Sequence, residues 1–276
     1  MRALPSVLRA RGARAFAACL LGAVAWLGGC AGQGVAPGGG EQELRTASDQ
    51  TENEKRARAR LELASAYFER GQTDVALDEL KQALAALPTL GEAYNLRGLI
   101  YASLGEPRLA DESFQRALQL NARDGDAKHN YGWFLCQQSR FADAQAHFSA
   151  ALATPQYRGV PRTLLAQGVC QARDNRLPEA EATLMRAYEL DTANPTIAIN
   201  LAEVLYLRGN YERARFYVRR INQQPETVNA QSLWLAARIE QRVGNRAGVQ
   251  EFGKQLRERY PQAPQTLSYE RGRFDD

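Results

Sequence analysis

Apolar positions recur along most of this chain with the spacing of amphipathic helices, and the helices come in pairs. Residues that favour a tight turn separate the two helices of each pair and recur every 34 to 36 residues. These turn residues are Gly71, Gly105, Ser139, Asn175, Gly209 and Gly244. An alanine lies five residues after each of the first five, and a glycine or alanine lies seven residues before each. Because antiparallel helices approach closely only where side chains are small, this pattern predicts a chain of helix–turn–helix units.

The period predicts six units, each with a helix, a short turn and a second helix. Their boundaries are 57–90, 91–124, 125–160, 161–194, 195–228 and about 229–262. The third unit carries a two-residue insertion in the stretch TPQYRGVP, which lengthens the turn to the fourth unit. Thr51 and Glu54 have the spacing of a capping box, so we expect the first helix to begin near Glu52.

A tail, residues 263–276, follows the last unit, whose sequence departs most from the repeat pattern. Three large apolar residues of this tail are expected to cover the exposed end of the last helix. They are Leu267, Tyr269 and Phe274.

Two stretches resemble the tetratricopeptide repeat, a helix–turn–helix motif of 34 residues. They are YNLRGLIYASLGEPRLADESFQRALQL (94–120) and YGWFLCQQSRFADAQAHFSAAL (131–152). The resemblance implies an all-α fold, a right-handed superhelical solenoid of about six units. It also implies a concave surface, lined by the first helix of each pair, that binds protein segments.

By the same resemblance, one stripe of side chains along the first helices faces this groove and is expected to contact a partner. The stripe includes Asn95, Leu99, His129, Trp133, Leu165, Val169 and Tyr206. Trp133 is suited to anchor a partner, or else it packs between helices. Asn130 and Asn200 occupy a position that clamps a terminal carboxylate in some members, but here they lie two repeats apart.

Four cysteines are present, and two of them lie within the repeats. Cys136 and Cys170 fall on the first helices of neighbouring repeats, where they form either a disulfide or two buried thiols. A Cys–His nucleophile is excluded for Cys136, because His129 lies about 10.5 Å away along the helix axis and a working pair needs about 3 Å.

No catalytic residue, cofactor or metal site is expected from the sequence. The chain has two histidines, and it lacks a phosphate-binding glycine loop, a Gly-x-Ser-x-Gly motif and a CxxC pair. Arginines gather late in the chain, as solvated helix surface or as a contact for an acidic partner or lipid headgroups. They are Arg213, Arg215, Arg219, Arg220, Arg238, Arg242 and Arg246.

Residues 1–29 have the layout of a lipoprotein signal peptide. Four arginines precede an apolar run over residues 15–27, which is too short to span a bilayer comfortably. Leu27-Gly28-Gly29-Cys30 then resembles the lipobox of bacterial lipoproteins, which implies lipidation of Cys30 and cleavage before it. The alternative is an ordinary secretory signal with an incidental cysteine.

Residues 30–50 are rich in glycine and polar residues and are expected to form a flexible tether. Removal of the signal would take four arginines and no acidic residue, which lowers the formal net charge from +4 to about 0. A nucleic-acid partner is therefore not expected.

The combination of lipobox, tether and repeats resembles the type IV pilus biogenesis/stability lipoproteins, which include secretin pilotins. The most specific stretches are 129–148, 190–220 and 232–240. The resemblance implies a non-enzymatic lipoprotein on the periplasmic face of the outer membrane. Its implied partners are secretin subunits, whose localisation and multimerisation it assists, or the pilus fibre, which it stabilises. The alternative is a general periplasmic scaffold lipoprotein that recruits cell-wall enzymes.

Overall fold

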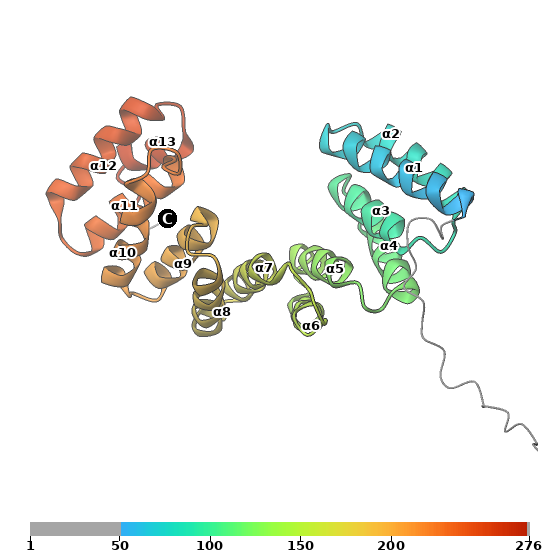
Figure 1. Ribbon diagram of the computed structural model, residues 1–276. Coiled ribbons are helices and arrows are strands. Elements are labelled where there is room, and N and C mark those ends of the chain that lie inside the picture. Colours follow the sequence, from blue (N-terminus) through green and yellow to red (C-terminus); the bar gives the residue numbers. More distant parts are fainter. Residues whose placement is uncertain (1–50, 275–276) are drawn as a thin grey trace, which may run out of the picture. The chain divides into compact units, whose positions relative to one another are not determined.

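The computed structural model describes residues 51–274, which contain thirteen α-helices and no β-strand (Figure 1). The first six helices are α1 (Glu52–Glu69), α2 (Thr73–Ala86), α3 (Gly91–Ser103), α4 (Pro107–Leu120), α5 (Gly125–Gln137) and α6 (Phe141–Leu152). The others are α7 (Val160–Arg173), α8 (Leu177–Leu190), α9 (Pro195–Leu207), α10 (Tyr211–Asn222), α11 (Ala230–Arg242), α12 (Arg246–Arg259) and α13 (Pro264–Glu270). The all-α prediction is confirmed. The signal peptide, Cys30 and the tether lie outside the described residues.

The first twelve helices pack as six consecutive pairs that coincide with the six units of the sequence period. Each first helix also contacts the first helix of the next pair, and each second helix contacts the first helix that follows it. The capping box predicted at Thr51 is present, with Glu54 as its second member, and α1 begins at Glu52.

The six turn residues adopt a left-handed backbone conformation, with φ between 57° and 78°. At each turn, the N–H of the following residue donates to a carbonyl five residues earlier, as Gln72 does to Tyr67 at 2.9 Å. This is the Schellman arrangement, which satisfies carbonyls left unpaired at a helix end. Ser139 and Asn175 adopt it without being glycine.

The small residues upstream of each turn mark the closest approach of the paired helices. A Cβ on Gly98 would lie 2.8 Å from the ring of Phe114, and one on Gly168 would lie 2.6 Å from Leu184. Real Cβ atoms do not come this close, so larger residues would push the helices apart.

The predicted insertion forms the connection between α6 and α7. Tyr157 of this loop packs so closely on Gly125 that a Cβ there would lie 2.5 Å from its ring. Its hydroxyl lies 2.7 Å from Thr163 Oγ1, at the start of α7. The loop is therefore fixed to α5 and α7, the first helices of repeats three and four.

The tail folds into α13, which contacts α11 and α12. Tyr269 fills the space over Gly253, where a Cβ would lie 1.8 Å from the Tyr269 Cζ. Phe274 stacks on Trp234 with 5.2 Å between ring centroids. Of the three residues expected to cover the last helix of the repeats, Tyr269 does so, while Phe274 packs on α11 instead. Leu267 is 44% exposed and covers neither helix.

Candidate functional site

An open groove runs across three successive first helices, α5, α7 and α9. Its volume is about 380 Å³, and we call it the Trp133 groove. Its lining residues are His129, Trp133, Arg162, Leu165, Ala166, Val169, Thr196 and Asn200. Four residues of the predicted stripe therefore meet in one place, because the 36-residue step from repeat three to repeat four sets Leu165 and Val169 beside His129 and Trp133.

His129 forms part of the wall of the groove and is 9% exposed. Its Nδ1 lies 2.9 Å from Thr163 Oγ1, which in turn contacts Tyr157 of the inserted loop. Burial, and then the nearby Arg162 charge, lower the pKa of His129 to about 4. The imidazole is therefore neutral at neutral pH and serves as a hydrogen-bonded wall.

Trp133 is half-buried, so it packs between helices and still has a free surface in the groove. It packs against the core cluster that contains Tyr131, Phe134 and Cys136, and it also lines the groove. A large aromatic surface held by a rigid core is the arrangement found at binding hot spots.

Cys136 and Cys170 are joined by a disulfide, with 5.8 Å between their Cα atoms. The bond links α5 to α7 and lies under the Trp133 groove, on the helices that carry Trp133 and Val169. Both cysteines are fully buried, so they act as a structural link.

Arg162 is the one charged residue that lines the groove while His129 is neutral. It forms an ion pair with Asp126, and both side chains are more than half exposed. Most of the lining is aliphatic or aromatic, so the groove is suited to an apolar protein segment with a polar or acidic flank. Arg162, Ala166 and Thr196 were missed in the sequence because the repeat pattern places them beside the stripe.

Two residues of the predicted stripe, Leu99 and Asn95, lie on α3 and do not line the Trp133 groove. Leu99 packs between two core clusters. Asn95 accepts a hydrogen bond from Asn130 Nδ2 at 3.2 Å, which ties α3 to α5. Asn200 lines the groove and donates through its Nδ2 to the Thr196 carbonyl, whereas Asn130 is not part of the lining, so the groove does not bring Asn130 and Asn200 together.

Tyr206 is the clearest correction to the predicted stripe, because it is 5% exposed and covered by the chain's own tail. Its hydroxyl donates to the Phe274 carbonyl at 3.5 Å, and Arg238 lies over its ring at 4.6 Å from the centroid. Arg238 Nε donates to the same carbonyl at 3.2 Å. We call the place where Tyr206, Trp234 and Arg238 meet Phe274 the tail site.

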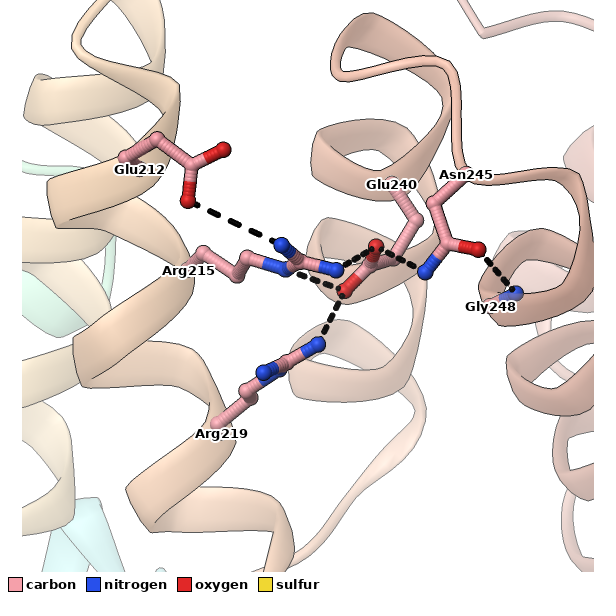
Figure 2. A network of polar contacts seen from close by, with 6 residues as sticks. All are labelled: Glu212, Arg215, Arg219, Glu240, Asn245 and Gly248. Carbon is pink, nitrogen blue, oxygen red and sulfur yellow. Dashed lines mark hydrogen bonds and ion pairs between the residues drawn. The ribbon is translucent and has the colours of Figure 1, made fainter.

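Most of the late arginines make contacts within the protein. Figure 2 shows Glu240 of α11 held by Arg215 and Arg219 of α10 and by Asn245, which also caps α12 through the Gly248 N–H. Burial raises the pKa of Glu240, but the hydrogen bonds from Arg215 and Asn245 outweigh it, and the pKa is lowered overall.

The late arginines are therefore both exposed helix surface, as expected, and a link between repeats. Five of the seven remain exposed, namely Arg213, Arg219, Arg220, Arg242 and Arg246. Arg213 pairs with Glu181, while Arg242 donates to Tyr206. Arg220 remains exposed on α10.

Residues 51–274 contain neither a candidate metal centre nor a candidate membrane span. In that range no cluster of three or more histidine, cysteine or acidic side chains could hold a metal ion. In the same range no helix is both long and apolar enough to cross a bilayer.

The chain matches three family models described as tetratricopeptide repeat, over residues 40–91, 91–124 and 164–239. It is 28% identical over 228 residues to the type IV pilus assembly protein PilF of Pseudomonas aeruginosa, covering 83% of this chain and 89% of PilF. It is also 28% identical over 135 residues to an uncharacterised protein of Haemophilus influenzae, covering 49% of this chain and 75% of that protein.

Two solved structures of type IV pilus proteins are also similar to this chain. The structure of P. aeruginosa PilF has a TM-score of 0.71 and 26% identity, covering 80% of this chain and all of that one. PilW, described as a widely conserved type IV pilus biogenesis factor, has a TM-score of 0.73 and 29% identity, covering 77% of this chain and 97% of PilW.

Proposed function

Because the chain belongs to the tetratricopeptide repeat family and is related to the type IV pilus biogenesis proteins PilF and PilW, we propose that it is a protein-binding scaffold of type IV pilus biogenesis. In this proposal it is a non-enzymatic outer-membrane lipoprotein that assists secretin localisation and multimerisation or pilus stability. The similarity to PilF over most of both chains is the observation that carries the proposal.

The Trp133 groove supports a binding role. It is open, mostly apolar and backed by a rigid core, and the disulfide holds two of its three helices in a fixed spacing. A partner segment would place an apolar side chain against Trp133, Leu165 and Val169, with Arg162 at its polar flank. In this proposal the partner is a segment of a secretin subunit.

The lipid anchor completes the proposed mechanism. Acylation of Cys30 would confine the repeats near the inner leaflet of the outer membrane, and residues 31–50 would give them reach. Confinement raises the effective concentration of the groove towards subunits that arrive at the same membrane. Several acyl chains on one cysteine would be enough for stable anchoring.

Deletion of the gene tests the proposed function, followed by complementation with single variants. We expect deletion to remove surface pili and heat-resistant secretin multimers, and the wild-type gene to restore both. The Trp133→Ala variant should restore neither, whereas Phe216→Ala, which removes a 60% exposed ring on α10, should restore both. Normal pili and multimers with altered cell shape would contradict the proposal and favour the scaffold of cell-wall enzymes.

The anchor is tested separately with Cys30→Ala. This variant should lose its lipid and no longer fractionate with the outer membrane. An unlipidated variant that still sediments with the outer membrane would show that the anchor is not what localises the protein.

A further inference from the structure

The tail site lies on the same stripe of the first helices as the Trp133 groove, two to three repeats further along. The turn residues Ser139 and Gly244 are 105 residues apart, and this step takes His129 to Trp234 and Trp133 to Arg238. Trp234 and Arg238 therefore hold the repeat positions that form the open groove in repeat three.

Phe274 occupies this part of the stripe in the way that a bound peptide would. Its ring packs on Trp234, and its main-chain carbonyl accepts hydrogen bonds from Arg238 Nε and the Tyr206 hydroxyl. These contacts use one aromatic ring and one main-chain carbonyl. A site of this kind selects an aromatic residue but does not depend on the side chains next to it.

The segment that carries Phe274 is short and lies at the surface after α13. Gly272 has φ of 67°, and Arg273 donates to the Ser268 carbonyl, so the chain turns back at the end of α13. Residues 270–273 are exposed, and the bond from the Tyr206 hydroxyl to the Phe274 carbonyl is long at 3.5 Å. The Phe274 ring also meets Tyr269 edge-on, with 6.0 Å between ring centroids. A competing segment needs to displace only this short stretch.

We propose that the tail site is a second recognition site, which takes a protein segment bearing an aromatic residue, and that Phe274 is an internal ligand that occupies it until such a partner arrives. This inference stands on the tail contacts alone and holds whether or not the protein serves type IV pili. The partner is defined by its chemistry, namely an aromatic side chain whose own carbonyl is free to accept from Arg238.

A labelled synthetic peptide of residues 270–276 tests the proposal in solution. We expect it to bind the full chain carrying Phe274→Ala at least about 10-fold more tightly than the wild-type chain, because the internal ligand is lost. Phe216→Ala, the matched removal of an exposed ring elsewhere, should bind the peptide as weakly as wild type. A peptide in which Phe274 is replaced by alanine should bind the Phe274→Ala chain at least about 10-fold more weakly than the native peptide.

Two further variants test whether the gained affinity depends on Arg238 and on removal of the tail. Arg238→Ala combined with Phe274→Ala should lose the gained affinity, and a chain ending at Glu270 should gain it as Phe274→Ala does. Equal binding to wild type and Phe274→Ala, or binding that ignores the peptide's aromatic ring, would overturn the proposal. A dimer of the wild-type chain that disappears with Phe274→Ala would also overturn it, because the occupant would then be the tail of a second copy.

Discussion

The Trp133 groove and the tail site are the same stripe of the repeat, one part open and the other covered. In repeats three and four, the first helices are joined by the Cys136–Cys170 disulfide, and the surface that lines the Trp133 groove is open to solvent. In repeats five and six, the link is the Glu240 network, and the surface is covered by Phe274. The comparison shows that a repeat position fixes where a side chain lies, while local additions decide whether a partner can reach it.

Removal of the disulfide should cause the largest loss of stability, and it acts on the open region. We expect Cys136→Ala with Cys170→Ala to lower the free energy of unfolding by about 4 kcal/mol, because the bond closes a loop across 34 residues of the unfolded chain. Urea unfolding of the two proteins measures the loss. A loss of less than about 1 kcal/mol would show that packing alone holds repeats three and four together.

Acidification should weaken the open region through His129. The pKa of His129 is about 4 in the folded protein and 6.5 in the unfolded chain, so between these values only the unfolded chain takes up the proton. Stability is therefore complete above pH 6.5 and falls by up to about 3 kcal/mol as the pH drops to 4.

Unfolding curves at several pH values, compared between wild type and His129→Gln, isolate this contribution. The variant should lose less stability over that interval. Burial also lowers the pKa of His147, so His147→Gln should remove a second, separate part of the pH dependence, and it measures that part from a position outside the groove. The same pH dependence in wild type and His129→Gln would refute the assignment.

Replacing one tryptophan at a time should separate the two regions by function. Under the proposed function, in which the partner is a secretin subunit, Trp133→Ala should weaken binding of purified secretin subunits about 30-fold, the effect of losing about 2 kcal/mol at a hot spot. Trp234→Ala should leave that affinity within about 3-fold, since its ring contacts the tail. Calorimetric titration measures both, and equal losses would mean that the partner spans both regions.

Gly253→Ala should cause the smallest loss of stability, and it acts near the tail site. The new methyl group would collide with Tyr269 and displace α13, and we expect stability to fall by only about 1 kcal/mol because a peripheral helix can move away. Trp234 fluorescence should report the opened tail site. Gly91→Ala, where the nearest atom would lie at 3.4 Å, is the control, and matching spectra for both variants would contradict the expected displacement.

Local chemistry made the helices and turns predictable from the sequence. A left-handed turn position requires glycine, asparagine or a small polar residue, and close helix packing requires glycine or alanine. Gly71 therefore predicts a turn, and Gly98 predicts a point where two helices pack closely. The same periodicity brought His129, Trp133, Leu165 and Val169 into one groove.

Contacts made by irregular segments were not predictable in the same way. Tyr206 has a groove position in the repeat, but a residue 68 positions later covers it, and no period relates the two. The pairing of Glu240 with Arg215 and Arg219 was likewise not predictable from the sequence, because it depends on the relative orientation of α10 and α11.

The position of the disulfide also affects how cooperatively the repeats unfold. In a linear array each repeat is stabilised by its neighbours alone, so the array behaves as a row of coupled units. The bond between Cys136 and Cys170 strengthens one coupling in the middle of the row, between repeats three and four. We therefore expect order to be lost from the two ends inward, so that the Trp133 groove belongs to the segment that stays folded longest.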